Sequence, residues 1–94
     1  MYDGFLKWRS ERLAVEASRF FSDGKSAEAL LSVTKSLECY SYNPAALRLL
    51  AKLQIASGED LAAMDAFKKL SATRAFTAAD AEDYARLAGR LKKW

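Results

Sequence analysis

The sequence predicts an all-α fold of about five helices, paired as antiparallel hairpins within one domain, 1–94. Alanine appears 18 times and leucine 13 times among the 94 residues, and both are strong helix formers. Valine, isoleucine and threonine, which fill strands, together appear only six times. Apolar residues recur at helical spacing in five stretches, and glycine, proline or a capping residue separates these stretches.

The first hairpin is predicted on either side of Gly24. Leu13, Ala17 and Phe20 lie on one apolar stripe of a helix over 4–23. Glycine is the usual residue where a helix ends in a left-handed conformation, so Gly24 ends this one. A second helix is expected over 27–40, with Ser26 as its N-cap.

The second hairpin is predicted around Gly58. Asn43 and Pro44 form a strong start signal, because Asn caps a helix and Pro tolerates its first position. We expect the third helix over 44–57 and the fourth over 60–74.

The fifth helix is predicted to begin after Thr77. Asp80 follows three positions later and completes the spacing of a capping box. Acidic residues come early in this helix and basic residues late, which matches the helix dipole.

The chain also repeats itself with a fixed period. Gly58 follows Gly24 by thirty-four positions, and the cap Thr77 follows the cap Asn43 by the same interval. Small residues recur where two helices must approach closely, and larger apolar residues fill the gaps beside them. The recurring positions are Leu13, Ala17, Phe20, Gly24 and Ala29 in the first copy, and Leu47, Ala51, Gly58, Ala63 and Phe67 in the second.

This pattern resembles the tetratricopeptide repeat family, whose unit is a helix-turn-helix of about 34 residues. The resemblance gives repeats at 10–43 and 44–77, a C-terminal capping helix at 78–94, and 1–9 as an extension of the first helix. Glu16, Gln54 and Leu70 depart from the usual residues. The resemblance implies a right-handed α-solenoid, and we expect a fragment of a larger protein because the period stops after two and a half units. An unrelated five-helix bundle is the alternative.

Composition argues against catalysis. The sequence has no histidine and a single cysteine, Cys39, and it lacks a glycine-rich phosphate loop. We therefore predict no enzyme, no catalytic residue, no metal and no cofactor. The net charge of +3 does not by itself indicate nucleic acid. No apolar run is long enough to span a membrane, so we expect a cytoplasmic protein or the soluble part of a membrane-anchored one.

The resemblance implies a scaffold that binds a peptide or a partner helix on a concave face, lined by the first helix of each pair. Its cations would favour an acidic peptide or a chain-end carboxylate. Alternatively, the cations are solvated charges with local acidic partners, or they form a basic face for nucleic acid. The predicted site residues are Phe21, Arg48, Lys52, Ile55, Arg86 and Arg90, with Glu11 among the other inner positions.

Residues 1–12 are a second candidate, because aromatic residues recur there every three positions beside cations. The aromatic residues are Tyr2, Phe5 and Trp8, and the cations are Lys7, Arg9 and Arg12. One interpretation is that the aromatic residues extend the stripe of the first helix and cover its open end. A second is an anchor at a membrane surface, with a spanning helix earlier in the natural protein. A third is that these residues pair two copies of the chain.

Overall fold

Five helices make up most of residues 2–91, the part of the chain that the computed structural model describes. No residue of this range forms a strand, so the all-α prediction is confirmed. The helices are α1 (Tyr2–Ser22), α2 (Ser26–Cys39), α3 (Pro44–Ala56), α4 (Asp60–Ser71) and α5 (Ala78–Leu91).

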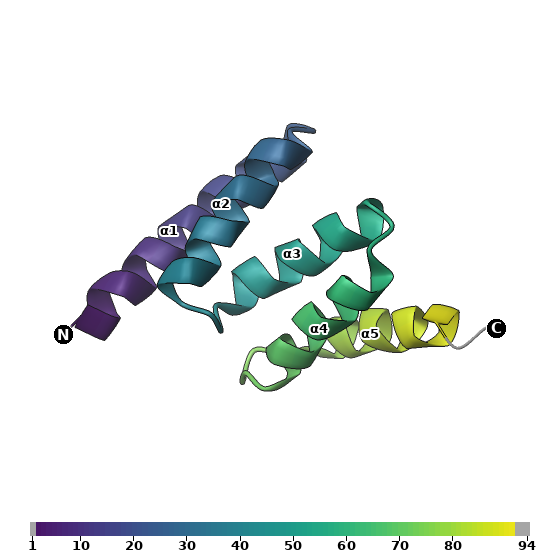
Figure 1. Ribbon diagram of the computed structural model, residues 1–94. Helices are drawn as coiled ribbons and strands as arrows, with labels where there is room; N and C mark the ends of the chain where they lie inside the picture. The colour runs from purple at the N-terminus through teal and green to yellow at the C-terminus, as the bar shows by residue number, and fades with distance from the viewer. Residues whose placement is uncertain (1, 92–94) are drawn as a thin grey trace.

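The helices form two hairpins and one added helix (Figure 1). α1 lies along α2, and α3 pairs with α4. α3 also packs against both α1 and α2, and α5 lies against α4. The second hairpin therefore holds the other helices together, α3 on one side and α4 on the other.

The two hairpin turns have the same hydrogen bonds at positions one period apart. Gly24 and Gly58 have φ of 78° and 80°, the left-handed conformation expected after each helix. Lys25 N donates to Phe20 O at 2.8 Å, and Glu59 N donates to Gln54 O at 2.8 Å. This bond closes the last helical turn in the pattern of a Schellman motif. The sequence period thus corresponds to a repeated backbone geometry.

Two of the predicted helix caps are confirmed. The Asn43 side chain accepts a hydrogen bond from Ala46 N at 3.3 Å. At the start of α5, Thr77 N donates to Asp80 Oδ2 at 3.0 Å and Asp80 N donates to Thr77 Oγ1 at 3.2 Å, which is the capping box.

Most predicted boundaries differ from the structure by one or two residues, and two differences concern the start of α2 and the end of α4. Ser26 is the first residue of α2 and not its cap; Lys25 occupies the cap position without a side-chain hydrogen bond. α4 ends at Ser71, before the predicted end at 74. The Thr73 hydroxyl donates to Leu70 O at 2.7 Å and accepts from Ala75 N at 3.2 Å, so it closes a turn where the helix was expected to continue.

The core consists of two apolar clusters on opposite sides of α3, and Leu37 and Leu50 pack against both. Of the recurring positions, six are buried, while Leu13 and Phe20 are half-buried. One cluster joins α1 and α2 to α3, and the other joins α3, α4 and α5. The first contains Ala17, Ala29, Val33, Leu49 and Leu53, and the second contains Leu47, Ala51, Ala63, Ala66, Phe67, Leu70 and Leu87.

A buried polar network joins the first hairpin to the start of α3. Ser10 Oγ donates to Ser36 O at 2.8 Å, and Ser36 Oγ donates to Ser10 O at 2.6 Å. Asn43 Nδ2 donates to Ser10 Oγ at 2.8 Å while the same side chain caps α3. The buried hydroxyl and amide groups of these three residues thus have hydrogen-bond partners in a place where apolar packing would otherwise be expected.

Candidate binding surfaces

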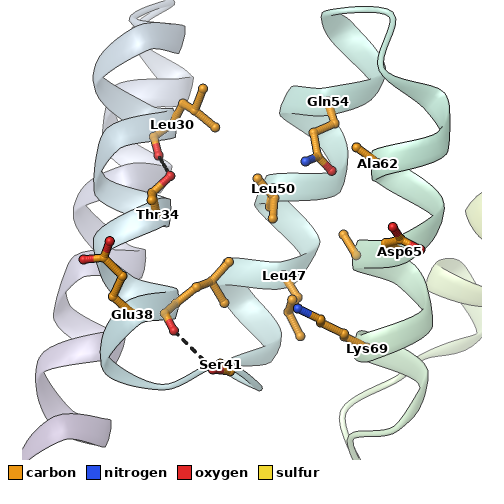
Figure 2. Close-up of a pocket in the computed structure, with 12 residues that line it drawn as sticks. Leu30, Thr34, Glu38, Ser41, Leu47, Leu50, Gln54, Ala62, Asp65 and Lys69 are labelled. Atoms are coloured by element: carbon orange, nitrogen blue, oxygen red, sulfur yellow. Dashed lines mark hydrogen bonds between the residues drawn. The ribbon is translucent and has the colours of Figure 1, made fainter.

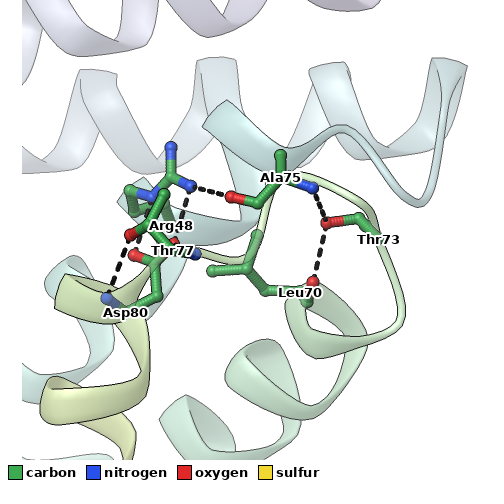
Figure 3. A network of polar contacts seen from close by, with 6 residues as sticks. All are labelled: Arg48, Leu70, Thr73, Ala75, Thr77 and Asp80. Carbon is green, nitrogen blue, oxygen red and sulfur yellow. Dashed lines mark hydrogen bonds and ion pairs between the residues drawn. The ribbon is translucent and has the colours of Figure 1, made fainter.

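Arg48 is half-buried, and groups of the chain itself occupy its guanidinium (Figure 3). Its Nε donates to Asp80 Oδ1 at 2.8 Å, and its Nη2 donates to Asp80 Oδ2 at 2.7 Å. Nη2 also donates to Ala75 O at 2.9 Å. Arg48 therefore connects the middle of the stack to the α4–α5 turn and to the first turn of α5.

The partner carboxylate is almost completely enclosed, because the Asp80 side chain is only 4% exposed. Hydrogen bonds from Arg48, and further bonds from Thr77, lower the pKa of Asp80 from 3.8 to about 2 in spite of its burial. The same ion pair raises the pKa of Arg48. Both groups are thus charged at neutral pH.

Two of the other three predicted cations also have acidic partners in the chain. Arg90 Nη2 lies 2.7 Å from Asp60 Oδ1, which joins the end of α5 to the start of α4. Arg86 forms ion pairs with Asp83 at 3.4 Å and with Glu82 at 3.8 Å on its own helix. Among residues 4–91, Lys52 is exposed and has no carboxylate at ion-pair distance.

The two predicted apolar site residues have different surroundings. Phe21 is exposed near the end of α1, whereas Ile55 is half-buried and packs against the cluster that joins α3, α4 and α5. The six predicted residues therefore divide into three arginines engaged in ion pairs, one core-packed isoleucine, and an exposed phenylalanine and lysine.

A hollow of about 690 Å³ lies between α1, the α2–α3 turn and the α4–α5 turn. We call it the turn hollow. Two exposed tyrosines, Tyr40 and Tyr42, line it, and the Lys7 ammonium lies 5.8 Å from the centre of the Tyr40 ring. Arg48 donates a hydrogen bond to the backbone oxygen of Ala75, which belongs to the wall that the α4–α5 turn forms. Its lining residues are Lys7, Glu11, Tyr40, Tyr42, Pro44, Ala72, Thr73, Arg74 and Ala75.

A groove of about 550 Å³ runs between α2 and α4, with α3 as its floor (Figure 2). We call it the α2–α4 groove. Leu30, Leu47 and Leu50 make it apolar, whereas Glu38 and Asp65 stand on opposite walls. Lys69 is also part of its lining.

Gln54 contributes an uncompensated polar atom to this groove. Its side chain lies beside Leu50 and Ala62 in Figure 2. Gln54 Oε1 is buried and has no hydrogen-bond partner among the described residues. A buried acceptor without a donor is destabilising, so this atom lowers the stability of the folded chain.

The outer face of α1 is the third candidate surface. Phe5, Trp8 and Val15 are 57%, 53% and 62% exposed, an unusual exposure for three large apolar residues on one helix. The Arg12 guanidinium lies 5.2 Å from the centre of the Trp8 ring, so a cation covers part of the indole.

Comparison of the chain with models of protein families, with curated proteins and with solved structures found no match. Among the described helices, none combines the length and the apolar composition needed to cross a bilayer.

Sequence reasoning misses the partner of Arg48 and most of the turn hollow. The sequence assigns Asp80 only a capping role. The equivalent position one period earlier is Ala46, which is buried, so Asp80 also occupies a position that the repeat buries. A carboxylate at a position that is buried in the preceding copy predicts a nearby cation. The aromatic linker around Tyr40 and Tyr42 is the corresponding signal for the hollow.

Proposed function

We propose that this chain is a non-catalytic interaction module of the tetratricopeptide type, and that it binds an extended acidic peptide in the turn hollow. Three features support the repeat architecture. These are the matching hydrogen bonds at the two glycine turns, the packing of α3 against both helices of the first hairpin, and the added α5.

The observation that carries the binding proposal is the combination of exposed tyrosines and cations in one concavity. Tyr40 and Tyr42 offer large, stiff rings that lose little conformational entropy on contact. Lys7 and Arg74 provide positive charge on two different walls. An extended peptide with carboxylates would satisfy these cations while its backbone lies on the tyrosines.

The charge distribution favours a peptide over a nucleic acid. A basic face for phosphates needs several unpaired cations in a row. Three of the four predicted cations are instead paired with carboxylates of the chain.

The test is a selection of random heptapeptides displayed on phage, with the full chain as bait, followed by calorimetry on the synthesised consensus. We expect the selected peptides to be rich in Asp and Glu. The double variant Lys7→Glu/Arg74→Glu should weaken their binding at least tenfold, because two attractive contacts become repulsive.

The matched control is Lys35→Glu, which reverses an exposed charge on α2 outside the turn hollow and should leave affinity unchanged. Selection of peptides without acidic residues, or equal affinity in the double variant, would overturn the proposal. Binding that falls by powers of ten between low and moderate salt, with nucleic acid as competitor, would favour the nucleic-acid alternative.

A further inference from the structure

The outer face of α1 occupies positions that serve for stacking elsewhere in the chain. On α3, Ala46, Leu49 and Leu53 are buried, and the two leucines belong to the cluster shared with the first hairpin. One period earlier, the same positions on α1 hold Arg12, Val15 and Arg19, and all three are exposed. Among the described helices, then, none covers this face of α1.

The opposite end of the stack does not have this character. On α5 the exposed positions are small or charged, including Ala81, Glu82, Ala85 and Gly89. Such a polar outer face is what closes a helical stack against water. Among the described residues of these two end helices, the exposed large apolar side chains therefore lie on α1, where Phe5 and Trp8 add to Val15.

The α2–α4 groove has the complementary chemistry. Its floor is apolar, and Glu38 and Asp65 stand on its two walls, where Lys69 is also part of the lining. The outer face of α1 combines apolar side chains with Arg12 and Arg19, and Glu11 and Glu16 stand beside these cations.

We propose that the outer face of α1 from one copy of the chain docks in the α2–α4 groove of a second copy. Arg12 and Arg19 would then meet the acidic walls, and Trp8 and Val15 would lie against the apolar floor. The two surfaces are different, so the contact is head-to-tail and can continue from copy to copy. It is also small, so the assembly should be weak and dependent on concentration.

The experiment is sedimentation equilibrium of the full chain from about 10 µM to about 1 mM, a range suited to weak association. Wild type should gain mass with concentration. Arg12→Glu/Arg19→Glu should remain monomeric because its α1 is acidic and meets an acidic groove. Glu38→Arg/Asp65→Arg should also remain monomeric because both surfaces are then basic. All four residues are exposed, so both variants should fold.

Mixing the two variants provides the decisive measurement. Each surface of one variant is then complementary to a surface of the other, so the mixture should associate as wild type does. The control Lys25→Glu/Lys35→Glu makes the same change in charge at exposed positions outside both surfaces and should associate normally. A mixture that stays monomeric, or single variants that associate like wild type, would overturn the proposal.

Trp8→Ala gives an independent readout. It removes an exposed aromatic side chain and should weaken association without lowering the melting temperature of the monomer, because Trp8 is 53% exposed. A Trp8→Ala variant that associates as wild type does would overturn the proposal. Binding of monomeric wild type to phosphatidylserine vesicles, with no self-association at any concentration, would overturn the proposal in favour of a membrane surface.

Discussion

Arg48 and Asp80 form a two-point ion pair that joins α3 to the first turn of α5, with N–O distances of 2.8 and 2.7 Å. The same carboxylate completes the capping box with Thr77. Two side chains from distant parts of the sequence thus fix both where α5 begins and where it lies.

Replacement of Asp80 by alanine should destabilise the protein by about 2–4 kcal/mol, because it removes a helix cap and leaves the Arg48 charge without its partner. Urea unfolding followed by circular dichroism measures this change. Asp83→Ala removes an exposed ion pair within α5 and should cost less than about 0.5 kcal/mol. Equal losses in the two variants would contradict the special role of Asp80.

Acid should remove the contribution of Asp80. Its pKa is lowered from 3.8 to about 2 in the folded protein, so the stabilisation is fully present above about pH 5 and is lost as the pH falls toward 2. The difference corresponds to about 2 kcal/mol. Unfolding free energies of wild type and Asp80→Asn between pH 6 and pH 2 should converge at the acidic end. A constant difference across this range would show that the carboxylate does not titrate as described.

The buried hydroxyl network should respond as one unit. Ser10→Ala leaves Asn43 Nδ2 without an acceptor and should cost about 1–3 kcal/mol. In the Ser10→Ala background, Ser36→Ala should destabilise the protein by less than Ser36→Ala does in the wild type, because the two hydroxyls share hydrogen-bond partners. A double-mutant cycle in urea measures the coupling, and Ser18→Ala, on the exposed side of α1, is the control. Strict additivity would mean that the network is not cooperative.

Glycine substitutions should have opposite signs at the turns and in α5. Gly24→Ala forces a side chain into the left-handed conformation and should cost about 1–2 kcal/mol. Gly89→Ala adds a methyl group in open space within a helix and should stabilise the protein by about 0.5–1 kcal/mol. Thermal unfolding distinguishes them, and a stabilising Gly24→Ala would contradict the strain argument.

Local signals in the sequence locate the helices well. Asn43, Thr77 and the two turn glycines each act through neighbouring backbone groups, so their effect is visible within a short stretch of chain. The end of α4 is predicted too late because the side-chain turn made by Thr73 competes with the helix, and composition does not reveal which of the two conformations is favoured.

The candidate surfaces are less accessible to prediction. Helical spacing places Arg48 and Ile55 on the face lined by the first helix of each pair, but it does not reveal what packs over them. Arg48 is covered by a carboxylate from α5, and Ile55 by the cluster that joins α3, α4 and α5. The turn hollow depends on two turns that are distant in sequence, so its shape requires the packed structure.

The position of Asn43 has a consequence for recognition. Its side chain is bonded to Ser10 and to the first turn of α3, so the joint between the hairpins is locked before any ligand arrives. Tyr42 is the preceding residue in the chain and lines the turn hollow. A peptide would therefore meet a rigid receptor already shaped for it, and little of its binding free energy would be consumed in ordering the protein.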